Sequence, residues 1–199
     1  GRLTGKVGSF DLGAMSLQTR DDDRAGVEST NFSVLRVRHD ILSRSSVGAM
    51  FTNRSRASGT AGSNQAFGVD AAFSFFQDVS LFGYLAQTRT EGVTGDDRSY
   101  LGNFSYAGDL WGVTGGYLRV GENFDPEVGF LRRKGFREMT GSARYSPRPG
   151  ISWMRRVSLQ GNVDYLELAP GHLVGNRTLQ GQFQLEFESS DAFNLNVND

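Results

Sequence analysis

Two carboxylates in one short segment are the residues of this sequence best placed to do chemistry. Asp125 and Glu127 are separated by a single residue. A pair of acidic side chains on either side of a sugar–sugar bond is the acid–base machinery of most glycosidases. The residue between them is Pro126, in a stretch that reads as a surface loop. Such a loop offers no desolvated pocket to raise the pKa of one carboxyl group, so we expect no catalysis here.

The residues around these carboxylates form a candidate binding site in a long loop. Its members are Asn123, Asp125, Glu127, Arg132 and Arg133. We expect the two carboxylates to meet one or both arginines. Phe124, Val128 and Phe130 would be costly to leave in water, so we expect them to fold the loop back into the protein. The loop is then either pinned by its own ion pairs and aromatic packing, which is the favoured interpretation, or in contact with a ligand or partner.

Other combinations of reactive residues lack the spacing that their chemistry needs. His39 and Asp40 lie beside Ser43, but the acid and the base are adjacent in a tight turn and no nucleophile elbow is present. The run Asp21-Asp22-Asp23 lacks the spaced pattern of a calcium loop. There is no cysteine, and the two histidines are far apart. We expect no enzyme activity, no metal site and no cofactor.

Composition narrows the class of protein. The net charge of −1 over 199 residues leaves no electrostatic drive toward nucleic acid. Hydrophobic residues make up 38% of the chain, which argues against helical membrane spans of about 20 consecutive apolar residues. A membrane β-barrel remains compatible with this value, because only alternate residues of its strands face lipid. The chain begins at Gly1 without Met, and we expect it to be a piece of something longer.

Alternation of apolar and polar residues recurs along the chain and indicates β-strands that would position the candidate loop. The clearest run is 178–188, where Leu179, Phe183, Leu185 and Phe187 alternate with Gln180, Gln182, Gln184 and Glu186. Successive side chains of a strand point to opposite faces. This segment therefore has one apolar face, which we expect to meet lipid, and one polar face.

The connections between the predicted strands are as informative as the strands. Strands are expected at 2–8, 10–20, 31–39, 42–53, 65–76, 79–89, 98–107, 110–120, 135–146, 152–168 and 176–189, with a twelfth beginning at Phe193. Tight connections are expected at 8–9, 40–41, 77–78, 108–109 and 146–151, and long ones at 21–30, 54–64, 90–97, 121–134 and 169–175. Short turns at one rim and longer loops at the other are typical of outer-membrane barrels, whereas a soluble sandwich has no such requirement.

Three stretches of sequence resemble a known family. They are RLTGKVGSFDLGAMSLQT, NFSVLRVRHDILSRSSVGAMFTNR and YLRVGENFDPEVGFLRR followed by KGFREMTGSARYSPRP. Together they resemble a family of outer-membrane barrels of unknown function that commonly follow an amino-terminal module similar to family-nine carbohydrate-binding domains. The resemblance covers most of residues 1–150 and is most specific at 123–130. It implies a location and a fold rather than an activity.

The sequence as a whole predicts an all-β protein, an antiparallel up-and-down transmembrane β-barrel. We expect residues 1–199 to form one barrel domain or barrel segment of 11–12 strands, part of a larger barrel. The expected location is the bacterial outer membrane, with a structural, anchoring or transport role as a porin-like protein of Gram-negative bacteria. Expected partners are the lipid bilayer or lipopolysaccharide, missing barrel strands, a carbohydrate-binding-like module or another chain, but not nucleic acid. The alternative is a soluble or surface β-rich module for adhesion or glycan binding.

Overall fold

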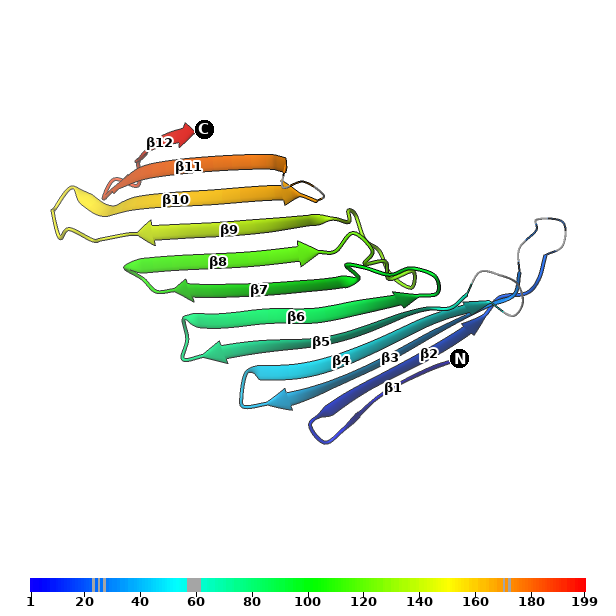
Figure 1. The fold of residues 1–199 in the computed structure, drawn as a ribbon. Coiled ribbons are helices and arrows are strands. Elements are labelled where there is room, and N and C mark those ends of the chain that lie inside the picture. Colours follow the sequence, from blue (N-terminus) through cyan, green and yellow to red (C-terminus); the bar gives the residue numbers. More distant parts are fainter. Residues whose placement is uncertain (23, 25, 27, 57–61, 170, 172) are drawn as a thin grey trace. The chain divides into compact units, whose positions relative to one another are not determined.

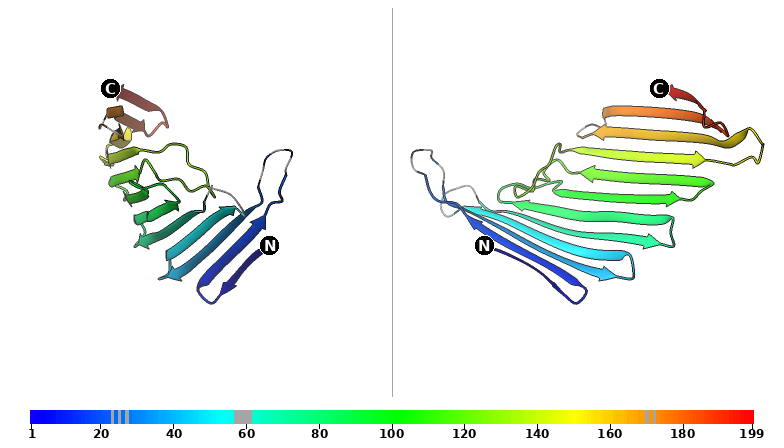
Figure 2. Two further views of the ribbon diagram at one scale, coloured as in Figure 1. Left: turned by 45° about the vertical axis from the view of Figure 1, so that its right-hand side comes forward. Right: turned by 180° about the vertical axis from the view of Figure 1, so that it is seen from behind.

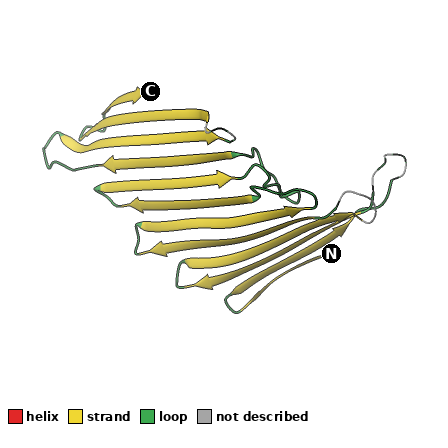
Figure 3. Ribbon diagram, in the orientation of Figure 1, coloured by secondary structure: helices red, strands yellow, loops and turns green. Residues whose placement is uncertain are grey.

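Strands account for all the regular structure in the described part of the chain, which is every residue except 23, 25, 27, 57–61, 170 and 172 (Figure 3). In this computed structural model the strands are β1 (Arg2–Val7), β2 (Phe10–Gln18), β3 (Thr30–Ile41), β4 (Ser45–Arg56), β5 (Asn64–Phe75), β6 (Val79–Thr90), β7 (Arg98–Ala107), β8 (Trp111–Val120), β9 (Phe136–Tyr145), β10 (Met154–Leu168), β11 (Leu173–Phe187) and β12 (Ala192–Asn198). No helix among the described residues is long and apolar enough to cross a membrane.

The strands form a meander in which sheet order equals chain order. Each strand is hydrogen-bonded to the one before it and the one after it, from β1 to β12 (Figure 1). Neighbouring strands run antiparallel. Among the described residues no pairing joins β1 to β12, so the sheet is open. The predicted antiparallel up-and-down sheet is confirmed.

The chain divides into two compact units, which are described separately. Unit 1 comprises Gly1–Phe73, Phe82–Leu101 and Arg119–Phe136. Unit 2 comprises Ser74–Leu81, Gly102–Leu118 and Arg137–Asp199.

In unit 1 the pairing register of β2–β5 gathers apolar side chains in rows on one face. The rows are Phe10, His39, Val47 and Ala71; Leu12, Val37, Ala49 and Val69; and Ala14, Leu35, Phe51 and Phe67. The next row on the same face is Ser16, Ser33, Asn53 and Gln65. This face, called here the apolar face, therefore carries a band of apolar side chains with a polar border.

The opposite face of unit 1, called here the polar face, carries charged residues that bridge strands. Arg36 on β3 extends across β4 to the carboxylate of Asp70 on β5, where its Nη2 donates to Oδ2 at 2.8 Å. Gly48 of β4 stands opposite Asp70, and a Cβ on Gly48 would lie 2.6 Å from Nη2 of Arg36. Glycine at position 48 thus leaves the guanidinium its path over the strand.

Unit 2 repeats the division into two faces. Val157, Leu159, Gly161 and Val163 of β10 stand opposite Leu185, Phe183, Gly181 and Leu179 of β11, and Leu195 and Phe193 of β12 continue two of these rows. The other face is rich in amides, with Gln180, Gln182 and Gln184 of β11 opposite Asn198, Asn196 and Asn194 of β12. The predicted alternation of 178–188 is confirmed, since its apolar side chains share one face.

Burial is inverted relative to a soluble domain. Only two hydrophobic residues of the described chain are buried, Val120 and Phe124, whereas the largest fully buried side chains are Asn64, Thr88 and Ser99. Large apolar side chains in mid-strand are exposed, as Leu85 is at 61% and Val69 at 54%. In soluble proteins, large apolar side chains dominate the buried set and the polar ones are mostly exposed.

Several predicted connections differ from the structure, three of them as follows. The turn expected at 40–41 lies at 42–44, because β3 continues to Ile41 and Leu42 adopts the left-handed conformation (φ 56°) that reverses the chain. The long loop expected at 169–175 is reduced to 169–172, because β11 already begins at Leu173, which pairs with Leu168. The β9–β10 connection, expected to be tight, covers 146–153. Strict alternation of tight and long connections therefore ends after β9.

Candidate functional site

The candidate loop is residues 121–135, which join β8 to β9 in unit 1 and are called here the strap. Its first residues dock on the connection between β6 and β7, residues 91–97, and the two segments lie side by side (Figures 1 and 2). The backbone N–H of Gly121 donates to the carbonyl of Arg98 at 2.8 Å, and that of Asn123 donates to the carbonyl of Asp96 at 2.9 Å. The Nδ2 of Asn123 donates to the carbonyl of Thr94 at 3.0 Å.

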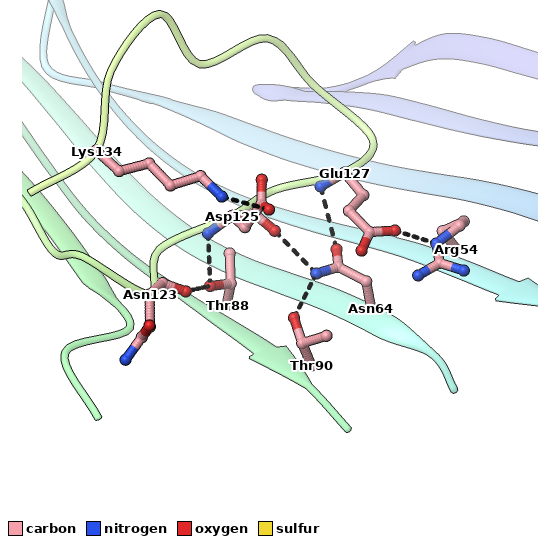
Figure 4. A network of polar contacts seen from close by, with 8 residues as sticks. All are labelled: Arg54, Asn64, Thr88, Thr90, Asn123, Asp125, Glu127 and Lys134. Atoms are coloured by element: carbon pink, nitrogen blue, oxygen red, sulfur yellow. Dashed lines mark hydrogen bonds and ion pairs between the residues drawn. The ribbon is translucent and has the colours of Figure 1, made fainter. Parts of the chain in front are cut away.

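Asn64, the first residue of β5, holds the middle of the strap (Figure 4). Its side chain is completely buried, at 0% exposure. Its Nδ2 donates to the carbonyl of Asp125 and to Oγ1 of Thr90, both at 2.8 Å. Its Oδ1 accepts from the backbone N–H of Glu127 at 3.2 Å. One amide thus satisfies two backbone groups of the strap that no sheet neighbour reaches.

Thr88 of β6 is a second buried anchor, beside Asn64 in Figure 4. Its Oγ1 accepts from the backbone N–H of Asp125 at 3.1 Å and donates to the carbonyl of Asn123 at 3.4 Å. Together Asn64 and Thr88 bind the strap backbone at 123, 125 and 127. Pro126, which has no N–H, keeps this stretch out of regular strand pairing.

Two ion pairs fasten the carboxylates of the strap. Glu127 pairs with Arg54 of β4, whose side chain is only 11% exposed, and Asp125 pairs with Lys134 at the far end of the strap (Figure 4). Asn53 of β4 belongs to the polar border row of the apolar face. Its neighbour Arg54 therefore points to the opposite face, which is the polar face. The strap therefore lies on the polar face, across β4, β5 and β6.

The structure brings together three of the five predicted site residues. Asn123, Asp125 and Glu127 belong to the anchored network, while Arg132 and Arg133 are exposed and take no part in it. The partners of the carboxylates are Lys134 and Arg54 rather than Arg132 or Arg133.

The predicted apolar packing of the strap holds for one phenylalanine. Phe124 is buried at 6% exposure, whereas Phe130 is 86% exposed, so the expectation that Phe130 folds inward is wrong. The bond from the backbone of Gly135 to Gly121, at 3.4 Å, ties the two ends of the strap together. Phe130 lies beyond the anchored stretch 123–127.

Sequence reasoning missed Arg54, Asn64, Thr88 and Thr90. Asn64 and Arg54 were assigned to the ends of a long loop at 54–64, and neither was connected with the loop at 121–134. The signal that could have found Arg54 and Asn64 is the alternation along β4 and β5. Both residues continue it, so their side chains extend the polar face.

The contacts of this arrangement attach the strap to the sheet. Asp125 and Glu127 are each held by a cation, and the remaining anchors are an amide and hydroxyl groups. Among the described residues no group of three or more His, Asp or Glu side chains is placed to hold a metal ion. The site is therefore a clamp that fixes a loop over the polar face.

Comparisons with known proteins return no relative: no protein-family model, no curated protein and no solved structure matches this chain.

Proposed function

We propose that this chain spans the bacterial outer membrane as a β-barrel or barrel segment, with its apolar face in lipid and its polar face lining a passage that the strap narrows. The inverted burial carries this proposal. An exposed, contiguous apolar band with buried polar side chains is unfavourable in water and favourable in a bilayer.

The length of the apolar band supports a membrane span. In β5 the alternating apolar residues extend from Phe67 to Phe75, and in β10 from Val157 to Tyr165. Eight steps of about 3.4 Å make roughly 27 Å of strand. At a strand tilt of about 40° the band would be about 21 Å tall, close to the roughly 25 Å of outer-membrane barrels.

The borders of the band also fit a bilayer. The position that follows Phe67 on the apolar face of β5 is Gln65. The position that follows Tyr165 in β10 is Glu167, which accepts from Nε of Arg137 at 2.7 Å. In both units the change from apolar to polar side chains occurs next to the connections expected to be extracellular.

The strap supports a passage rather than a filled core. Its anchors Arg54, Asn64 and Thr88 come from three adjacent strands, so it crosses the sheet instead of extending into solvent. In a barrel such a segment reduces the open cross-section. Edge strands in lipid also need partners, which further strands of a larger barrel would supply for β1 and β12.

The test compares two neighbouring residues on opposite faces. Leu159→Arg, near the middle of the band, should destabilise the chain in liposomes by about 2–4 kcal/mol, whereas Gln160→Arg on the polar face should have little effect. Urea unfolding in liposomes measures both. Equal effects at the two sites, or recovery of the wild-type chain in the soluble fraction without detergent, would favour the soluble alternative. Planar-bilayer conductance then tests the passage itself.

A further inference from the structure

The apolar face of unit 1 is hollowed. A hollow of about 700 Å³ is lined by apolar side chains that include Leu35, Phe51, Phe67 and Leu85. A second hollow of about 520 Å³ adjoins it, since both are lined by Val37, Ala49, Val69 and Leu85. The two form one continuous depression, called here the groove. Each hollow has a volume within the roughly 300–1,000 Å³ of small-molecule sites.

Small side chains explain the depth of the groove. Ala49 of β4, Ala71 of β5 and Gly83 of β6 line it, between larger neighbours such as Phe51 and Leu85. On a lipid-facing band these positions could carry bulky apolar residues at no cost in solvation. The groove therefore follows a line of small residues across three adjacent strands.

Three arginines border the end of the groove that lies next to the long connections. Arg98, the first residue of β7, lines the groove itself. The guanidinium of Arg89 lies over the ring of Phe67, 5.6 Å from its centroid. Arg119 lies over the ring of Tyr100 at 6.0 Å and donates to Asp96 at 2.9 Å.

The charges at this end are not balanced. Asp96 is engaged by Arg119, and Asp97 accepts from Gln87 at 3.1 Å and 3.2 Å. In the described part of the chain neither Arg89 nor Arg98 has a carboxylate partner. Both side chains are exposed at the border where the apolar band ends.

We infer that the groove binds one phosphorylated lipid, with an acyl chain along the line of small residues and its phosphate at Arg89 and Arg98. Guanidinium groups match phosphate oxygens in charge and geometry. Because the groove is apolar and ends at two guanidinium groups without a carboxylate partner, it is complementary to an acyl chain with an anionic head group. Arg119, fixed by Asp96, positions the aromatic wall of Tyr100. This inference rests on the proposed function, since it requires the apolar face to lie in lipid.

The experiment uses the full chain in phosphatidylcholine nanodiscs that contain a minor fraction of phosphatidic acid with a photoactivatable diazirine in one acyl chain. After irradiation, mass spectrometry should find labelled peptides from β4, β5 and β6 in excess over peptides from β10 and β11. The Arg89→Ala/Arg98→Ala variant should lose about tenfold or more of this preferential labelling, as expected for the loss of charge-assisted hydrogen bonds. Ala49→Phe, which fills the groove and leaves the charges intact, should also lower it.

Matched controls separate the sources of the signal. Arg132→Ala/Arg133→Ala removes the same charge from the exposed part of the strap and should leave labelling unchanged. Diacylglycerol with the same diazirine chain should label all apolar-face peptides evenly. Equal preference for diacylglycerol, even labelling by phosphatidic acid, or displacement by inorganic phosphate alone would overturn the lipid site. Failure of the chain to enter nanodiscs would overturn the proposed function as well, whereas insertion with even labelling overturns this inference alone.

Discussion

Replacing Asn64 by alanine should release the strap without unfolding the sheet. The substitution deletes three hydrogen bonds made by a side chain that is 0% exposed. Two of these bonds reach the strap, so at about 1 kcal/mol for each bond the strap loses about 2 kcal/mol of anchoring. The carbonyl of Asp125 and the N–H of Glu127 also lose their partners, which adds to this value when the groups stay buried. A loss of about 2 kcal/mol corresponds to a local opening that is about 30-fold more frequent.

Hydrogen exchange of the amides at Asp125 and Glu127 measures this opening directly. Their exchange should accelerate about 30-fold in Asn64→Ala, while the amides of β10 and β11 keep their protection. Asn176→Ala is the matched control, because Asn176 is exposed and, among the described residues, its amide donates only to Thr178, at 3.3 Å. A change of less than about fivefold in Asn64→Ala, or an equal change in the control, would refute the assignment of Asn64 as the main anchor.

Two further predictions concern charges. Glu127→Ala leaves the nearly buried Arg54 without its carboxylate partner and should destabilise the strap by about 3 kcal/mol. The double variant Arg54→Met/Glu127→Leu should lose less stability, because no unpaired charge is left buried. Urea unfolding in liposomes measures both variants, and a double variant as unstable as the single one would contradict the reasoning. In the β7–β8 turn, the hydrogen bond from Arg148 holds the pKa of Asp109 below its ordinary value. The contribution of this pair to stability is therefore present above the ordinary carboxyl pKa and lost as pH falls through the lowered one. An NMR titration of Asp109 should shift to higher pH in Arg148→Ala, and an unchanged titration would show that the pair does not form in solution.

The strand order could be predicted from sequence because alternation is a local signal. The apolar and polar residues of 178–188 assign their faces without knowledge of any distant contact. The turn at 42–44 was missed because Leu42, a residue with no turn preference, occupies the left-handed position. The early start of β11 was missed because Gly175 reads as a loop residue, although its neighbour Val174 pairs with Glu167.

The candidate site was only partly predictable, and the reason is sequence separation. The loop could be recognised from its own composition, but its anchors cannot be seen there. Asn64 lies 61 and 63 residues away from the backbone groups that it binds. Arg132 and Arg133 were chosen as partners because they are near in sequence, whereas the register of β4 brings Arg54 to Glu127 instead. The long-range pairing of strands therefore decides which cation pairs with Glu127.

The alternation that builds the two faces also governs the chain before it folds. The apolar side chains are interleaved with polar residues and form no long continuous stretch. The unfolded polypeptide is therefore no more hydrophobic than that of an ordinary soluble protein. The unfolded chain therefore presents no long apolar segment of the kind that forms a membrane helix. Hydrophobicity emerges only when neighbouring strands come into register and align rows such as Leu35, Phe51 and Phe67. Under the proposed function, strand pairing therefore separates transit of the chain through water from its insertion into a bilayer. Premature pairing is the step at which the chain would aggregate.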